Sequence, residues 1–304
     1  MRFFQRPSRN IIIFLLAVLS ACSFVTSQSF ADTSGQAITA SPAVTQIAVD
    51  PGGTTTNKLD IVNSGTIAYK VTVSVSPYRV VGVDYDPQFT QLPGTVDPSK
   101  WVTLSQTNAS AAPHAVLTVN YSVTVPKNTA PGGYYAVIFA ETSPTATGGG
   151  VIAHNRVGNI LYITVRGQVK QGGALSTTRL PVFDVQSSLP MNLTVSNTGG
   201  VHYLSTATFT VKNRLTGKTV FHASYDRYIL PQTKRLIASS WTPAEPFGIY
   251  TISRSATIVG NTKSSPTQTI VYMKPWFFVT VCIIVVVLLA LLIRRAMYHA
   301  RQRR

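Results

Sequence analysis

Short runs of alternating apolar and polar residues dominate the chain between residues 32 and 274. In residues 69–75, Val71 and Val73 share one face, while Thr72 and Ser74 take the other. A period of two is typical of a strand with one buried face, as in an antiparallel sandwich. No amphipathic helical period of useful length interrupts these runs. The pattern therefore predicts an all-β fold.

The first set of runs fits an immunoglobulin-like β-sandwich over residues 32–169. The predicted strands are residues 43–49, 57–62, 69–75, 116–125, 134–140 and 158–166. Pro51-Gly52-Gly53 and Asn63-Ser64-Gly65 supply turn chemistry between them. Six or seven strands in about 130 residues is an immunoglobulin-like count. Two long polar connections, at 84–100 and 143–156, are of the length that makes a loop either functional or floppy.

A second, smaller immunoglobulin-like sandwich is predicted over residues 181–273, after a polar linker at 170–180. Its strands are expected at 191–196, 205–213, 219–225, 233–237 and 249–258. Asn197-Thr198-Gly199-Gly200 provides one of its turns. Residues 261–268 are polar and predict a stalk, with a last strand at 269–273.

The C-terminal end carries a transmembrane helix, predicted at 275–293. The run from Trp276 to Ile293 is apolar apart from Thr280, and Arg294 follows it directly. Eighteen residues at 1.5 Å each span about 27 Å, close to the hydrocarbon thickness of a bilayer. The basic tail at 294–304 predicts a cytoplasmic C-terminus and an extracellular sandwich pair, hence a single-pass type I protein of the cell membrane.

The N-terminal end predicts a secretory signal peptide over residues 1–31. A basic stretch precedes an apolar run at 11–19, and small residues lead up to a cleavage site after Ala31. A second cleavage site is open: residues 19–22 resemble a bacterial lipobox, which would place the cut before Cys22 and acylate its sulfur. The sequence does not choose between the two.

The net charge of +16 does not indicate nucleic-acid binding. Eight basic residues flank the two apolar ends, where membrane insertion requires them. The remaining excess is spread along the strands without a run. A mild attraction to anionic wall polymers or lipids is the more fitting reading.

No catalytic or metal-binding motif is visible, so the chain is not expected to be an enzyme or to need a cofactor. The five histidines are more than four residues apart, and there is no phosphate-binding glycine loop or Gly-x-Ser-x-Gly turn. Asp84 and Asp86 form the one close acidic pair. They fit either a hard-cation site or a solvated loop.

Several short motifs resemble the WxL-interacting protein family of Gram-positive surface proteins. In the first half they are Ser41-Pro42-Ala43-Val44, Val49-Asp50-Pro51-Gly52, Val62-Asn63-Ser64-Gly65, Val125-Pro126-Lys127 and Pro131-Gly132-Gly133-Tyr134-Tyr135-Ala136. In the second half they are Asn197-Thr198-Gly199, Phe209-Thr210-Val211, the stretch at 230–235 and Gly248-Ile249-Tyr250. These motifs are structural turns and strand ends, so they assign no binding role to any residue.

The resemblance implies that the first domain binds peptidoglycan and the second binds a WxL-type or host surface protein. The expected function is then a membrane-anchored adhesion or scaffold protein. An alternative is a membrane-tethered assembly factor that uses strand addition, because residues 156–162 also resemble a pilus-chaperone domain. The partner, the contacting residues and the oligomeric state are not predicted.

Overall fold

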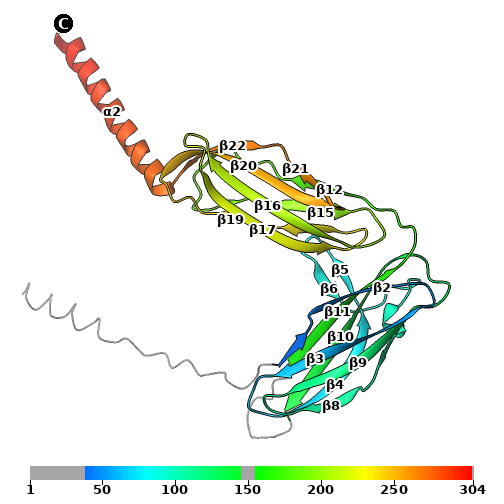
Figure 1. The fold of residues 1–304 in the computed structure, drawn as a ribbon. Coiled ribbons are helices and arrows are strands. Elements are labelled where there is room, and N and C mark those ends of the chain that lie inside the picture. Colours follow the sequence, from blue (N-terminus) through cyan, green and yellow to red (C-terminus); the bar gives the residue numbers. More distant parts are fainter. Residues whose placement is uncertain (1–37, 145–154, 303–304) are drawn as a thin grey trace, which may run out of the picture.

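The computed structural model describes residues 38–144 and 155–302 (Figure 1). It contains two β-sandwiches in tandem, with one C-terminal helix leading away from the second (Figure 1). The predicted all-β, immunoglobulin-like fold class is therefore confirmed. The predicted signal peptide, its two candidate cleavage sites and residues 145–154 of the connection predicted at 143–156 lie outside the described residues.

The first sandwich packs a four-stranded sheet against a five-stranded sheet. The first sheet has the order β1-β3-β9-β7 and the second β2-β11-β10-β4-β8. The strands are β1 (Ile38–Ser41), β2 (Val44–Val49), β3 (Thr54–Asn63), β4 (Tyr69–Pro77), β7 (Val102–Leu104), β8 (Asn108–Ala111), β9 (Val116–Thr124), β10 (Gly132–Pro144) and β11 (Asn155–Val165), with a short 3-10 helix η1 (Pro98–Trp101) before β7. Alternate residues of the two sheets, such as Leu59, Ile138 and Ile163, are fully buried between them.

The chain changes sheets near its described start. β1 pairs with β3 in one sheet, and β2 pairs in parallel with β11 in the other. The peptide bond between Ser41 and Pro42 at this switch is cis. Asn159 on β11 is buried and donates to the Pro42 carbonyl at 2.5 Å and to the Thr45 hydroxyl at 2.9 Å. A buried side-chain amide thus holds the crossing segment against the second sheet.

The second sandwich packs a three-stranded sheet, β12-β15-β18, against a larger sheet with the order β13-β22-β20-β16-β17. Its strands are β12 (Gly173–Thr177), β13 (Phe183–Asp184), β14 (Leu189–Pro190), β15 (Leu193–Asn197), β16 (Tyr203–Asn213), β17 (Thr219–Ile229), β18 (Lys234–Ile237), β19 (Ser240–Trp241), β20 (Phe247–Ile258), β21 (Asn261–Ser264) and β22 (Gln268–Met273). β14 pairs with β19, and β21 with β20. Phe209, Ile252 and Tyr272 are among the buried core residues.

Two segments that were predicted to be irregular are strands. β12 lies inside the predicted linker at 170–180 and pairs with β15 from Gly173↔Asn197 to Thr177↔Leu193. β21 lies inside the predicted stalk at 261–268 and pairs with β20. No residue of β12 or β21 is buried. β21 is exposed throughout, and in β12 Leu175 packs against the core, so neither segment carries a repeated hydrophobic period. Their backbone pairing is decided by the neighbouring strand instead.

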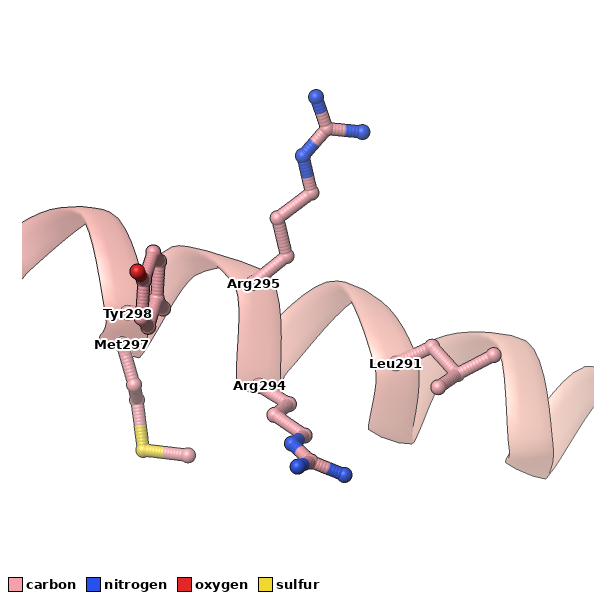
Figure 2. Close-up of a pocket in the computed structure, with 5 residues that line it drawn as sticks. All are labelled: Leu291, Arg294, Arg295, Met297 and Tyr298. Atoms are coloured by element: carbon pink, nitrogen blue, oxygen red, sulfur yellow. The ribbon is translucent and has the colours of Figure 1, made fainter.

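Helix α2 (Pro275–Gln302) contains the predicted membrane span. An 18-residue window within Pro275–His299 has a mean hydropathy of 3.2, and no residue of that window is buried by the rest of the chain. Figure 2 shows Arg294 and Arg295 leaving opposite sides of the helix just after Leu291. The start of the helix is joined to the second sandwich, because Phe278 packs on Phe183 of β13 with ring centroids 6.0 Å apart.

Candidate functional site: the domain junction and the free edge of β17

A hairpin of the first sandwich reaches the second one. The hairpin is formed by β5 (Arg79–Val81) and β6 (Asp86–Gln88), and Figure 1 shows it between the two sandwiches. At its tip, Tyr85 adopts a φ of 66°, an uncommon conformation for a bulky residue. The Tyr85 hydroxyl accepts a hydrogen bond from the Leu230 amide at 2.9 Å and is also bonded to the Thr233 hydroxyl. The strained backbone conformation at Tyr85 therefore places its aromatic side chain against the second domain.

Further contacts fix the tip of this hairpin. The Leu236 amide donates to the Val83 carbonyl at 2.8 Å, across the domain boundary. The Arg235 guanidinium lies over the Tyr85 ring, 4.3 Å from its centroid. A cation in this position is attracted by the electron-rich face of the ring. Burial lowers the pKa of Arg235, while burial raises the pKa of Tyr85.

An aromatic cluster fills the rest of the junction. Tyr135 and Tyr162 come from the first domain, and His202 and Tyr228 from the second. The Tyr162 ring lies 4.8 Å from His202 and 5.0 Å from Tyr228, the latter in an edge-to-face arrangement at 89°. Such pairs are favourable beyond the area that they bury. Gln46 on β2 also donates to the Tyr228 hydroxyl.

His202 is held in the neutral form at this junction. Its Nδ1 lies 3.1 Å from the Tyr135 hydroxyl, which also accepts the His202 backbone N–H at 3.1 Å. Burial lowers the pKa of His202 from 6.5 to about 4. A charged imidazole would lose hydration among the three tyrosines without gaining an anionic partner from the described cluster.

The junction was not predicted, although its tyrosines were visible in the sequence. Tyr135 and Tyr162 lie on β10 and β11, where they occupy the face opposite the first core. Aromatic residues on the outer face of a sandwich strand are a signal that this face is covered. The connection at 84–100, predicted to be functional or floppy, begins in this junction with Tyr85.

The free edge of β17 is the longest unpaired strand edge in the described part of the chain. β17 has eleven residues and pairs with β16 alone. The end strands of the other main sheets have three to six residues, and β13, at the other end of the β17 sheet, has two. An exposed edge presents unpaired N–H and C=O groups, which another extended chain can pair with.

The hydrogen bonds of two arginines show which backbone groups of β17 face outward. Arg227 donates to the Asp226 carbonyl and Arg235 to the Tyr228 carbonyl, both at 2.9 Å. Residues two apart in a strand direct their backbone groups to the same side. We therefore place the N–H and C=O groups of His222, Ser224, Asp226 and Tyr228 on the side away from β16.

Positive charge gathers around this edge. Residues 212–235 contain six basic residues and one acidic residue. Residues 170–274 as a whole contain eleven basic and three acidic residues, whereas residues 38–166 contain seven and six. The surplus of basic over acidic residues outside the two ends of the chain was expected to be spread along the strands. It lies instead mainly in residues 170–274, which include the second sandwich. A clustered field of one sign favours partners of the opposite sign.

The acidic pair that fits either a cation site or a solvated loop lies in the β5–β6 hairpin. Asp84 and Asp86 are both exposed in the β5–β6 hairpin. Among residues 38–144 and 155–302 there is no group of three or more histidine, cysteine, aspartate or glutamate side chains that could hold a metal ion.

Comparison with known proteins gives no family for this chain. No family model and no curated protein matches the sequence. Among solved structures, the class 5 fimbriae chaperone CfaA shares 8% identity at a TM-score of 0.40, covering 77% of this chain and 99% of its own. The Escherichia coli chaperone DraB shares 12% identity at a TM-score of 0.38, over 77% and 96% of the two chains. These superpositions are loose, and the fold class rests on the two pairs of sheets described above.

Proposed function

We propose that this protein is a non-enzymatic, membrane-anchored extracellular module that captures an extended, acidic segment of a partner protein along the free edge of β17. The long edge of β17, along which no other strand pairs and whose carbonyls at Asp226 and Tyr228 accept only arginine side chains, is the observation that carries this proposal. Helix α2 tethers the module, and the arginines after the apolar run favour a cytoplasmic C-terminus. The aromatic junction holds the first sandwich in a fixed place relative to this edge.

The partner is defined by backbone pairing and by charge. An added strand gains main-chain hydrogen bonds from the outward groups of β17, and these bonds carry no sequence preference. The preference for acidic residues comes from the basic residues that surround the strand. This proposal agrees with the strand-addition alternative of the sequence analysis and does not require a particular family of partners.

Replacing Ser224 by proline tests the proposal. Ser224 is exposed on β17, and its N–H is one of the outward groups, so Ser224→Pro removes a donor of the free edge and leaves the β16 ladder intact. Ser224→Ala keeps the N–H and is the matched control. The measurement is capture of acidic surface proteins from an extract of the source cells by the full chain in detergent. We expect capture by the wild type and by Ser224→Ala but not by Ser224→Pro.

The outcome that contradicts the proposal is equal capture by both variants at equal thermal stability. Capture that is unaffected by salt would contradict the acidic character of the partner, because exposed charge pairs are screened at high ionic strength. Thermal melts of both variants identify any loss of capture that comes from unfolding.

Binding of peptidoglycan by the first sandwich, which the family resemblance implies, remains a separate proposal. The near balance of charges in residues 38–166 means that such binding would rest on specific contacts, and it should survive added salt. Retention of the full chain on purified sacculi at two salt concentrations checks this, and release at the higher concentration would contradict it.

A further inference from the structure

A cavity in the second sandwich contains two buried charges of opposite sign that are not paired with each other. The cavity has a volume of about 190 Å³. Arg254 on β20 and Asp184 on β13 both line it, and they are 1% and 4% exposed. No ion pair joins them, since the ion pairs among the described residues involve other side chains. Burying a charge without a charged partner is unfavourable. Each of these two buried charges therefore lacks an oppositely charged group in contact with it.

The Arg254 guanidinium is bound by neutral acceptors. Its two terminal nitrogens donate to the carbonyls of Asn192 and Thr178, at 2.9 Å and 3.0 Å, and to the Gln268 side-chain oxygen at 2.6 Å. These bonds hold the group in position but leave its positive charge without an anion. Burial lowers the pKa of Arg254, as expected for a cation without a counter-charge. Arg179, which is exposed, adds a second positive charge to the cavity rim.

The Asp184 carboxylate has one buried oxygen with no partner. Oδ1 accepts the Gln186 backbone N–H at 3.2 Å, whereas Oδ2 has no hydrogen-bond partner among the described residues. The nearby Tyr272 hydroxyl is likewise buried and without a partner there. Burial and the Asp184 carboxylate both raise the pKa of Tyr272. Of the six buried side-chain polar atoms without a partner in residues 38–144 and 155–302, Oδ2 is the one that belongs to a charged group, for which burial without a partner is most unfavourable.

We propose that this cavity binds a small zwitterion of the amino-acid or short-peptide class. The ligand carboxylate would pair with Arg254 and Arg179, and its ammonium group would donate to the free Asp184 oxygen. Leu180 and Leu189 provide an apolar wall for the short carbon chain between the two charges. The site is separate from the free edge of β17, so it can be present or absent whatever the fate of the proposed partner capture.

The test is titration calorimetry of the full chain in detergent with zwitterions of increasing charge separation: glycine, β-alanine, γ-aminobutyrate and glycylglycine. Acetate and ethylamine carry one of the two charges each and are the ligand controls. We expect one or more zwitterions to bind and both single-charge compounds to bind at least about tenfold more weakly, since each lost charged hydrogen bond is worth about that factor or more.

Asp184→Asn and Arg179→Gln are the informative variants, because neither removes the Arg254 bonds that hold the strands together. Each is expected to weaken zwitterion binding about tenfold or more. Asp84→Asn, the same change at an exposed site in the first sandwich, is the matched control and should bind as the wild type does. The proposal is overturned if no zwitterion binds, if acetate or ethylamine binds as well as the zwitterions, or if Asp184→Asn keeps the wild-type affinity.

Discussion

Two buried asparagines have the same place and the same bonds in the two sandwiches. Asn63 ends β3, and its side-chain amide donates to the Ile67 carbonyl at 2.8 Å while its oxygen accepts the Gly65 N–H at 3.0 Å. Asn197 ends β15, donates to the Val201 carbonyl at 2.8 Å and accepts the Gly199 N–H at 2.8 Å. The Asn-x-Gly turns of the sequence are thus built around a buried amide that satisfies the backbone of the turn.

Replacing Asn197 by alanine should destabilise the second sandwich. Besides the turn, the Asn197 amide satisfies the buried Ile229 carbonyl at 2.9 Å, and the substitution leaves these groups without partners. We expect a loss of about 2–4 kcal/mol in the free energy of unfolding. Denaturant unfolding measures it. Asn261→Ala, at an exposed position, is the control and should change the stability by less than about 0.5 kcal/mol.

His202 gives the junction a defined dependence on pH. Its pKa is about 4 in the folded protein against 6.5 for an ordinary histidine, so between these values the unfolded chain binds more protons. Stability is therefore lost as the pH falls from about 6.5 to about 4. The full shift corresponds to about 3 kcal/mol, and solvent screening of the half-buried ring reduces this to about 1–2 kcal/mol.

Denaturant unfolding of the wild type and of His202→Gln at pH 7.5 and pH 4 measures this contribution. Glutamine does not titrate, so the difference in stability between the two proteins should shrink or reverse at the lower pH. A difference that is the same at both pH values would show that His202 does not carry the effect.

At the scale of single elements, the β5–β6 hairpin decides how the two sandwiches are joined. It belongs to the first domain in sequence, but Tyr85 makes its hydrogen bonds in the second. Both hydrogen-bond partners of Tyr85, the Leu230 amide and the Thr233 hydroxyl, lie in the turn at 230–233 between β17 and β18. This turn therefore connects the free edge of β17 to the junction. The strained φ of Tyr85 is compatible with folding because these contacts stabilise it.

Tyr85→Ala should uncouple the two sandwiches. The variant loses the bonds to Leu230 and Thr233 and the contact with Arg235, while both cores remain intact. We expect small-angle scattering of the detergent-solubilised chain to show a broader distribution of distances than for the wild type. Val81→Ala, an exposed change in the same hairpin, is the control, and identical profiles for all three proteins would contradict a fixing role for Tyr85.

At the scale of the whole molecule, the basic sandwich lies next to the apolar C-terminal helix and the nearly neutral one lies beyond it. β22 ends at Met273 and helix α2 begins at Pro275, so the second sandwich is joined to the span almost directly. Lys274 between them donates from its side chain to the Ala244 carbonyl at 2.6 Å. This short, bonded connection holds the second sandwich close to the start of the helix.

The orientation of the chain can be checked by labelling on intact cells. We expect Thr216→Cys, in an exposed turn of the second sandwich, to react with a membrane-impermeant maleimide. His299→Cys, near the end of helix α2, should react only after permeabilisation, because the basic tail favours the cytoplasmic side. The parent protein, which keeps Cys282 in the helix, gives the background, and labelling of His299→Cys on intact cells would contradict the orientation.

The sequence by itself determined the fold class, the strands that bury one face and the long apolar helix at the C-terminal end. In each case the signal was local: alternation along β4 or β9, Asn-x-Gly at strand ends, and an unbroken apolar run before Arg294. These features are set by the period of the backbone and by the hydrophobic effect, so they can be read along the chain.

Only the tertiary structure decided which elements meet. β12 and β21 have no hydrophobic period, and their pairing depends on the strand beside them. The tyrosine and histidine cluster, the free edge of β17 and the cavity between Arg254 and Asp184 join residues that lie far apart in the sequence. Contacts of this kind form when the strands of each sandwich pair and the two sandwiches pack together. A local pattern of residues does not specify which distant residue each side chain will contact.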